Sequence, residues 1–518
     1  RFRSTPFCRS VSHRRPRLTD SSRVSGTEPP APRSTRPTSP DDSYKWKAFA
    51  AIAISFVTMV ASMSMVFVGL SEIADHFDVT LRSVSWVIIA EGLTISALMM
   101  PMGRLADIIG RRKVHLVGLI LFGGGVVFTA LAPTFGLLIT ARVVTAIGNS
   151  MGQSVGTAMV ISVFPARERG KAIGSQTTAV ALGGASGPII AGLMLQWLPW
   201  QAMFWALTIP IGIAFVAGYF ILDENRVSQN RPQQRPSFDW LGAILSGATV
   251  IIAVILINNP FGVPVLSPLI LGGTVTAVML FTVFVWWELK TDSPMLELRM
   301  FRNLIFSMAV ATRFLGFLAT TAVRFLMPIY LISLRSLEEA AAGGVLFLTS
   351  LGMGIAAQSS GRLGDKFGER PFAIFGFVML VVTAVAFMTF TSDTEMWKVM
   401  VVMLVNGLAM GLWNVPNNSI IMGAVPRGSL GVVGALTNLT RNVGNVTGQA
   451  IGSAIIVGVM VSEGFDIPLS EIGGDQAAGR SFMNGWRLAY VFVTAFSLLG
   501  LLLSILTKPV RAEQTEPD

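Results

Sequence analysis

Residues 103–113 read GRLADIIGRRK, and they directly follow the apolar run SWVIIAEGLTISALMMPM at 85–102. A related phrase, GRLGDKFGER, stands at 361–370, again directly after an apolar run. Both phrases fit the pattern GRLxDxxGxR, and chance produces two copies in one chain much less easily than one. The pattern therefore indicates an internal repeat of two related halves, a feature of secondary transporters.

The chain is apolar far beyond the range of soluble globular domains. It has 518 residues, of which 52% are hydrophobic and 13% charged, and its mean hydropathy is +0.63. Continuous apolar runs of about 18 to 30 residues recur along it, each long enough to cross a bilayer as a helix. Barrel strands are shorter and alternate in polarity. We therefore predict an all-α membrane protein with fourteen transmembrane helices at 48–70, 84–102, 114–132, 135–163, 172–195, 203–222, 240–257, 267–287, 304–333, 343–360, 371–391, 397–423, 432–461 and 486–506.

The region before the first span differs in composition. Residues 1–43 hold nine Arg against four acidic residues, with much Pro and Ser, and cannot bury enough apolar surface to fold. We predict a disordered basic tail over 1–45. This tail supplies about half of the net charge of +10, so the charge is no evidence for a nucleic-acid partner. The one cysteine, Cys8, also lies here, which excludes a disulfide or a cysteine-based metal site within a monomer.

Basic residues are distributed unevenly between the loops on the two sides of the membrane. If the first span leaves the cytoplasm, nineteen Lys and Arg residues lie in inside loops and five in outside loops. The five outside residues are Arg82, Arg335, Lys398, Arg480 and Arg487. Cytoplasmic loops carry such an excess of basic residues. We therefore predict a multi-pass protein of the plasma or inner membrane with both termini cytoplasmic, including a cytoplasmic tail at 508–518.

The first charged phrase resembles the signature of the major facilitator superfamily, G-x-L-a-D-r-x-G-r-r/k, which follows the second helix of those transporters. The matching residues are Gly103, Leu105, Asp107, Gly110, Arg111 and Arg112, with Ile108 in place of the usual basic residue. Glycines allow tight turns and close helix approach, and Asp107 can accept hydrogen bonds from a helix N-terminus or an Arg. We expect these residues to form a cytoplasmic gate, with Asp365 and Arg370 as partial counterparts in the second half.

The resemblance also implies a major facilitator fold with a particular domain plan. A twelve-span member places six helices between the two copies of the phrase, whereas this chain places eight. The spans at 240–257 and 267–287 are the natural extra pair, and the layout resembles the fourteen-span drug:proton antiporter branch. We expect an N-terminal six-helix half at 46–225, two extra central helices with linkers at 226–300, and a C-terminal six-helix half at 301–507.

The fifth span fits a second pattern of that branch, G-x8-G-x3-G-P-x2-G-G. Its sequence, GSQTTAVALGGASGPIIAGLML, has Ala191 in place of one Gly and otherwise matches at Gly174, Gly183, Gly187, Pro188 and Gly192. Small residues let helices approach closely, and proline bends a helix. In the family this pattern accompanies exporters rather than importers. A generic packing face of small residues is the alternative.

Ionisable side chains inside the bilayer cost at least about 2.5 to 3.5 kcal/mol at mid-helix, so we expect them to be paired or functional. One acidic residue, Glu91, lies well inside a span, at a depth similar to that of Arg142. Arg142 stands in a segment that resembles the family's fourth-helix motif R-x-x-Q-G-x-G. Antiporters of this branch usually carry an Asp in the first helix, where this chain has Ser62. We therefore expect Glu91 to carry the coupling proton, with Arg142 as its partner; a static ion pair is the alternative.

Three further arginines lie within spans. Arg313 and Arg324 are eleven residues apart and so share a helical face, while Arg441 lies in a segment similar to the thirteenth helix of fourteen-span members. Together they make the pathway net positive, which favours an anionic or zwitterionic substrate; snorkelling to the interface is the alternative. Asn414 and Asn418 are candidate pathway residues. Alternatively, their side chains hold neighbouring helices together.

Other function classes lack the residues that they require. The sequence has no G-x-x-x-x-G-K-[ST] motif, which argues against an ATP-driven pump. Three His and one acid deep in a span do not make the clustered active site of a membrane enzyme. We predict a monomeric secondary transporter, without metal or cofactor, that exports small organic molecules or drugs in exchange for protons. The alternatives are a facilitator or importer of a small anionic metabolite, and a non-transporting sensor on the same scaffold.

Overall fold

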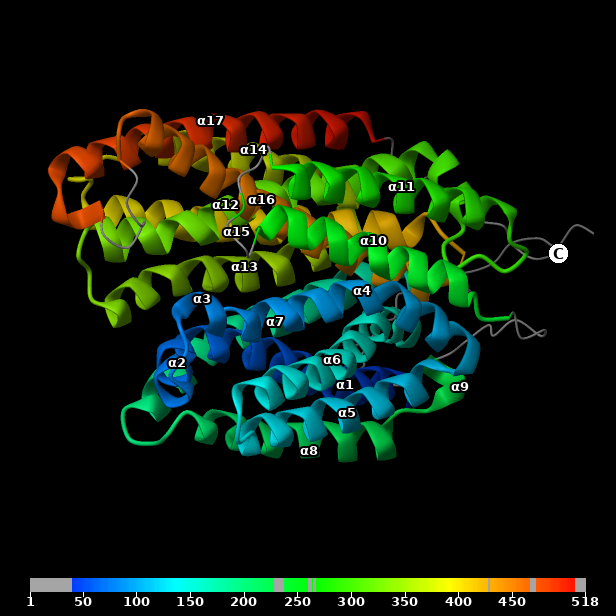
Figure 1. Ribbon diagram of the computed structural model, residues 1–518. Coiled ribbons are helices and arrows are strands. Elements are labelled where there is room, and N and C mark those ends of the chain that lie inside the picture. The colour runs from blue at the N-terminus through cyan, green and yellow to red at the C-terminus, as the bar shows by residue number, and fades with distance from the viewer. Residues whose placement is uncertain are drawn as a thin grey trace, which may run out of the picture.

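The structure of the protein, a computed structural model, describes residues 40–227, 237–259, 263, 267–426, 429–465 and 472–507. Within these ranges the chain forms helices and no strand, and fourteen helices are long and apolar enough to cross a membrane (Figure 1). The predicted all-α membrane fold with fourteen spans is thereby confirmed. Most of the expected tail at 1–45, and all of the expected tail at 508–518, lie outside the described residues.

The spans are long helices joined by short segments. In chain order they are α1 (Pro40–Val68), α4 (Trp86–Ile109), α5 (Arg111–Leu131), α6 (Phe135–Val163), α7 (Arg169–Leu195), α8 (Gln201–Ile221), α10 (Trp240–Asn258), α11 (Pro268–Lys290), α12 (Leu304–Pro328), α13 (Glu339–Phe367), α14 (Glu369–Met388), α15 (Met396–Gly423), α16 (Leu430–Ser462) and α17 (Gln476–Leu506). The shorter pieces are α2 (Leu70–Phe77), α3 (Leu81–Val84), η1 (Ala166–Glu168), α9 (Glu224–Val227), η2 (Leu298–Arg302), η3 (Ile329–Leu334) and η5 (Ile472–Gly474).

We expected each charged phrase to be a loop, but each forms two helix ends. Residues 103–109 are the last turns of α4, and α5 begins at Arg111, so that Gly110 alone separates the two helices. Gly110 has φ 114°, and Gly368, between α13 and α14, has φ 88°. Residues with a Cβ are strained at these φ values. The last glycine of each phrase therefore allows one span to turn directly into the next.

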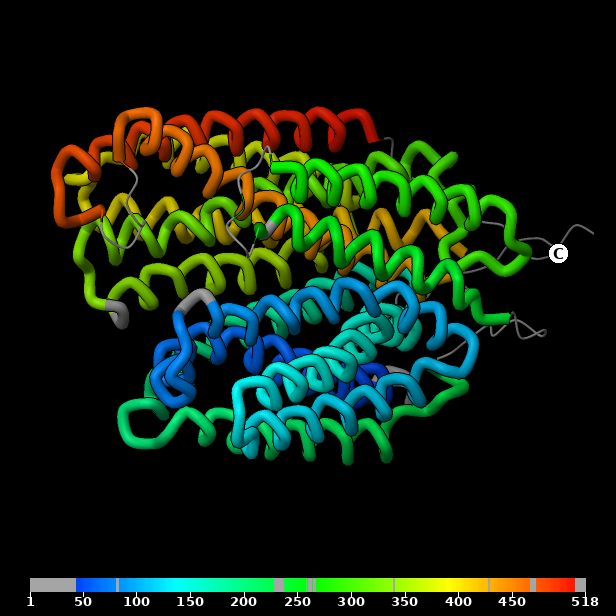
Figure 2. The backbone as a smooth tube through the Cα atoms, viewed as in Figure 1, coloured from blue at the N-terminus to red at the C-terminus, as the bar shows by residue number. Residues whose placement is uncertain are grey.

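The helices form two groups that lie against each other (Figure 2). In the N-terminal half (α1–α8) the largest contacts join α5 with α6 and α1 with α7, and in the C-terminal half (α12–α17) they join α13 with α15 and α14 with α15. The extra helices α10 and α11 pack on each other, and α10 also contacts α4 of the first half and α16 of the second. α11 leaves most of its apolar side chains exposed, as expected of a helix that faces lipid.

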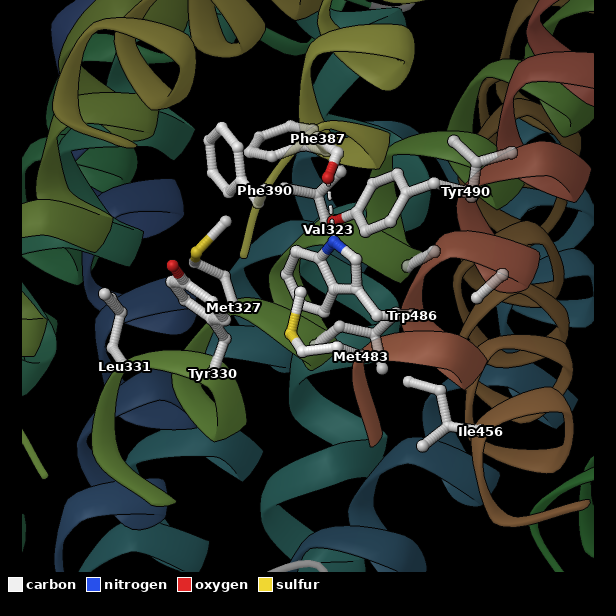
Figure 3. Packing of buried hydrophobic residues seen from close by; sticks show 14 of the residues in the cluster. Val323, Met327, Tyr330, Leu331, Phe387, Phe390, Ile456, Met483, Trp486 and Tyr490 are labelled. Atoms are coloured by element: carbon white, nitrogen blue, oxygen red, sulfur yellow. Dashed lines mark hydrogen bonds between the residues drawn. The ribbon is translucent and has the colours of Figure 1, made fainter. Parts of the chain in front are cut away.

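An aromatic cluster lies in the C-terminal half, around the first part of α17 (Figure 3). Trp486 and Tyr490 of α17 pack against Phe387 of α14 and Tyr330 of η3, and all four side chains are fully buried. The Trp486 indole N–H donates to the Phe387 carbonyl oxygen at 2.8 Å, which satisfies its one donor inside the apolar core. This cluster fixes α17 against α12 and α14.

The last span begins earlier than its hydropathy suggested. We expected a span from residue 486, but α17 begins at Gln476, with the Asp475 carboxylate accepting from the Ala477 backbone N–H at 2.8 Å. Ala478, Phe482 and Trp486 then recur at four-residue spacing and are buried. Arg480 and Arg487, which we assigned to an outside loop, consequently lie within this helix.

Candidate transport pathway and gate

The aspartate of the first charged phrase joins the two halves. Asp107, in the last turn of α4, accepts a hydrogen bond from the Val432 backbone N–H at 3.1 Å, in the first turn of α16. The Arg111 guanidinium pairs with the other carboxylate oxygen of Asp107 at 3.0 Å and also donates to the Ser162 hydroxyl at 2.8 Å. The exposed N–H groups of a helix N-terminus attract anions. Asp107 therefore caps a helix of the opposite half.

The second phrase repeats this contact in the reverse direction. Asp365, in the last turn of α13, accepts from the backbone N–H groups of Gly170 at 2.7 Å and Lys171 at 2.8 Å, at the start of α7. The same seams are kept narrow by the glycine that opens each phrase. A Cβ at Gly103 would lie 2.7 Å from the Ala435 Cβ, and a Cβ at Gly361 would lie 2.8 Å from the Gly170 carbonyl carbon.

The last arginine of each phrase binds the end of its own half. Arg112 donates to the Tyr219 carbonyl oxygen at 2.6 Å, at the C-terminal end of α8, and Arg370 donates to the Ile505 carbonyl oxygen at the C-terminal end of α17. A cation at this position interacts favourably with the unpaired carbonyls and with the helix dipole. The two phrases thus share their contacts as well as their sequence. Each Asp accepts hydrogen bonds from the other half, and each Arg donates to the last span of its own half.

The hydrogen bonds between the two halves gather at the end of the bundle that holds Gly110 and Gly368, which we call the charged end. Apart from those of Asp107 and Asp365, they include Ser175 to Gln358 at 3.1 Å and Thr178 to the Gly354 carbonyl at 3.1 Å. Another joins Arg441 to Gln153. All of these residues lie in the part of their helices nearer the charged end. The structure is therefore closed at this end.

The two ionisable residues predicted to form a pair do so. Glu91 of α4 and Arg142 of α6 form an ion pair, and both side chains are completely buried. The pair is fully inside the N-terminal half, where the Arg142 guanidinium also lies over the Phe204 ring at 5.6 Å. Two nitrogens of this guanidinium, Nε and Nη1, have no hydrogen-bond partner among the described residues. A buried charge pair whose donors are only partly satisfied is sensitive to loss of either charge.

A line of neutral amides continues from this pair toward the other half. Asn149 donates to the Glu91 Oε1 at 3.5 Å, and Gln153, one turn further along α6, donates to the Asn149 Oδ1 at 2.8 Å. The Gln153 Oε1 in turn accepts from Arg441 of α16 at 2.8 Å. Asn438 of α16 adds a bond to the Gln153 carbonyl at 3.0 Å. We call Glu91, Asn149, Gln153 and Arg441 the polar relay.

Two of the predicted pathway arginines are placed very differently. Arg313 is buried and anchored, because its guanidinium donates to the Thr437 carbonyl and to the Asn414 Oδ1, each at 2.9 Å, and lies over the Phe317 ring. It does not reach an interface, so snorkelling does not explain it. Arg324 is exposed, and its one described contact is to the Met410 sulfur at 3.9 Å.

The asparagines of α15 mostly join helices. Asn414 accepts from Arg313, Asn406 donates to Thr383 of α14 at 3.1 Å, and Asn417 donates to the Ala309 carbonyl of α12 at 2.9 Å. The Asn418 Oδ1 is buried and has no hydrogen-bond partner within the described part of the chain. Of the two predicted pathway asparagines, Asn414 therefore lies beside Arg313, another predicted pathway residue.

The glycines of the fifth-span pattern line two seams of α7. Gly174 packs against Ala357 of α13, while Gly183 and Gly187 pack against α1. Pro188 lies inside the helix. A Cβ at Gly192 would meet nothing within 4 Å, so close packing does not require glycine there. α7 thus uses its small residues to contact the other half near the charged end and its own half farther away.

Sequence reasoning missed the middle of the polar relay and the helix N-termini that receive the two aspartates. Asn149 and Gln153 follow Arg142 by seven and eleven residues, a spacing that puts all three on one helical face. That periodicity was a usable signal. Gly170 and Val432 gave none, because the contacts are made by their backbone N–H groups.

Known proteins resemble this chain in sequence and fold. The family model described as Major Facilitator Superfamily matches residues 50–449. The chain is 28% identical over 411 residues to the riboflavin transporter RibZ of Clostridioides difficile, covering 79% of this chain and 88% of RibZ. It is 25% identical over 450 residues to the lincomycin resistance protein LmrB of Listeria innocua, covering 86% and 92%. The structure of the proton:xylose symporter XylE shares the fold with a TM-score of 0.64 at 13% identity, covering 91% and 97%.

Proposed function

This chain belongs to the Major Facilitator Superfamily and is a membrane transporter, and we propose that it exports small organic molecules in exchange for protons by alternating access. One observation carries the proposal. The fully buried ion pair of Glu91 and Arg142 connects through the polar relay to Arg441 in the other half. A titratable group linked in this way to a contact between the halves is what proton coupling requires.

Protonation of Glu91 changes the strength of the whole relay. The neutral acid no longer balances the Arg142 charge, and breaking a buried ion pair by neutralising one partner costs about 3–5 kcal/mol. The Asn149 amide also loses its anionic acceptor, so Gln153 and Arg441 are held less firmly. The two halves thereby respond to the charge of Glu91. Moving one proton down a potential of 100 mV releases about 2.3 kcal/mol, enough for a roughly fifty-fold substrate gradient.

The charged phrases serve as the gate that the proton cycle opens and closes. Asp107 and Asp365 hold the halves together through hydrogen bonds to helix N-termini, beside an apolar seam that includes Val432. Such hydrogen bonds can break and re-form as the halves rock. The excess of Lys and Arg near this end supports a cytoplasmic position, with both termini on the same side. We therefore propose that the structure is the state closed to the cytoplasm.

Export is supported by two features. α7 carries the glycine and proline pattern that accompanies exporters in the family, and one similar protein is named for lincomycin resistance. Import of a metabolite is the second candidate, because another similar protein is named a riboflavin transporter. The two candidates differ in the direction of net flux under the same pH gradient.

Purified protein in proteoliposomes tests the proposal. We expect vesicles to accumulate a transported dye against its gradient when the pH on the dye side is raised suddenly relative to the lumen, because luminal protons leave as the dye enters. The panel is riboflavin, fluorescein and rhodamine 6G, so that neutral, anionic and cationic compounds are all offered. Equilibration of the dye without accumulation would show a facilitator, and accumulation only in the direction of proton entry would show an importer.

A further inference from the structure

The described membrane interior contains more positive charge than negative charge. Arg142 is paired with Glu91, whereas no carboxylate of a described residue forms an ion pair with Arg313, Arg324 or Arg441. Each unpaired charge at mid-helix costs at least about 2.5 to 3.5 kcal/mol. Three unpaired guanidiniums are therefore expensive to keep unless an anion joins them.

The three guanidiniums form one electrostatic group. Arg441 of α16 lies close enough to repel both Arg313 and Arg324 of α12. Arg313 is already satisfied by two oxygen acceptors and an aromatic ring. Arg441 has one described acceptor, the Gln153 side chain, and Arg324 has only the thioether of Met410. Since a guanidinium has five N–H donors, Arg324 and Arg441 retain most of their donors for a ligand.

The helix around Arg324 is packed inside the protein and does not have the exposed apolar surface of a lipid-facing helix. Between Ile305 and Leu331, Arg324 is the one exposed residue, while residues one turn away, Thr320 and Met327, are buried. α16 presents a polar stripe to the same region, in which Arg441 and Asn445 are half-buried and Gln449 is exposed at four-residue spacing. The Asn445 side chain reaches α12 through a hydrogen bond from Thr321 at 2.5 Å.

We propose that Arg324 and Arg441 bind the anionic group of the substrate, in a site supported by the buried Arg313. The inference rests on the proposed transport function and names its substrate class: organic anions that carry a carboxylate, phosphate or sulfonate. Arg441 is then shared between the substrate and Gln153, so substrate binding acts on the same relay that responds to Glu91. An anion also offsets the positive charge of these guanidiniums.

Equilibrium binding of fluorescein tests this site. The full chain is placed in phosphatidylcholine nanodiscs at pH 7.5 without any gradient, and fluorescence anisotropy follows fluorescein, an anion, and rhodamine 6G, a cation. We expect saturable fluorescein binding at least tenfold tighter than that of rhodamine 6G. Arg324→Gln and Arg441→Gln should each weaken it at least tenfold, while the exposed Arg299→Gln, near the charged end, leaves it unchanged.

Arg324→Lys and Arg441→Lys keep the positive charge, so they distinguish loss of the anion site from misfolding of a variant. Each should bind fluorescein more tightly than its Gln counterpart, with unchanged elution on size exclusion. Absence of fluorescein binding, equal or tighter binding of rhodamine 6G, or indifference to both Gln variants overturns the anion site. The binding assay applies no gradient, so its result does not depend on whether transport is coupled to protons. If the protein prefers the cation but still exports in exchange for protons, the anion site is refuted and the proposed function stands.

Discussion

Ser62 is fully buried in α1, and its hydroxyl oxygen has no hydrogen-bond partner in the part of the chain that the structure describes. Drug:proton antiporters usually place an acid at the corresponding point of the first helix, which raises the question of whether Ser62 has a polar role in transport. We expect that it has no such role. Ser62→Ala removes an unsatisfied polar atom and no hydrogen bond, so the melting temperature in detergent should stay within about 1 °C or rise. A fall of several degrees, or slower transport in proteoliposomes, would show a partner for Ser62 in another state.

Gln153 carries the polar relay from one half to the other, and its removal should separate binding from coupling. Gln153→Leu keeps the side-chain volume but breaks the bonds to Asn149 and Arg441. We expect fluorescein binding to persist and pH-driven accumulation to fall at least tenfold. Gln176→Leu is the matched control, because that buried glutamine bonds only Thr157 within its own half among described residues. Equal accumulation by Gln153→Leu and the unmodified protein would contradict the relay.

The ionisable residues could be found from the sequence because a charged residue stands out in an apolar run and has a high free-energy cost within the bilayer. Glu91 and Arg142 were identified in this way, and the structure pairs them. Asn149 and Gln153 were missed, since neutral amides inside membrane helices commonly serve packing alone. Their role depends on distances between α4, α6 and α16, which no single span encodes.

At the scale of helices, the two aspartate caps should contribute similarly to closure of the charged end. Hydrogen bonds to a charged group contribute about 1.5–3 kcal/mol each. Asp107→Asn and Asp365→Asn each remove that charge from a helix N-terminus, and each should shift part of the population to a state open at this end. Spin labels at the exposed positions Lys113 and Lys366, in a Cys8→Ser background, report the change as a longer distance by double electron–electron resonance.

The control for these variants is Asp475→Asn, which alters a helix cap at the start of α17 within one half. Its distance distribution should match that of the unmodified protein. If the Asp107 and Asp365 variants also match it, the aspartates do not hold the halves together.

Helix existence was predictable, while helix ends were less so. Fourteen apolar runs gave fourteen spans because only a continuous helix satisfies the backbone within a bilayer. The ends differ where polar residues continue a helix beyond the apolar run. α17 begins ten residues earlier than expected, and the charged phrases are helical up to Gly110 and Gly368. Hydropathy measures the apolar length and carries no information on the helical turns outside it.

For the whole molecule, alternating access requires the seam between α7 and α13 to open. The chain's one cysteine is Cys8, so engineered pairs can be read cleanly after Cys8→Ser. A Cβ at Gly354 would lie 3.8 Å from the Thr178 Cγ2, within reach of a disulfide. We expect Thr178→Cys with Gly354→Cys to stop transport when oxidised and to recover with a reductant.

A second cysteine pair provides the control. Thr383 of α14 and Asn406 of α15 lie in hydrogen-bond contact within the C-terminal half. A disulfide there should leave transport largely intact, because the two helices move together. Continued transport by the oxidised Thr178–Gly354 pair would mean that this seam does not open during the cycle.

Glu91 is the proton carrier of the proposed cycle, and transport by Glu91→Gln tests this role directly. The variant is reconstituted beside the unmodified protein, and two rates are measured with the same dye: exchange without a pH gradient and accumulation driven by one. Because the amide mimics the protonated acid, we predict that exchange persists while pH-driven accumulation falls to the level of protein-free vesicles. Accumulation by Glu91→Gln that still follows the pH gradient would contradict the proposed role of Glu91 as the proton carrier.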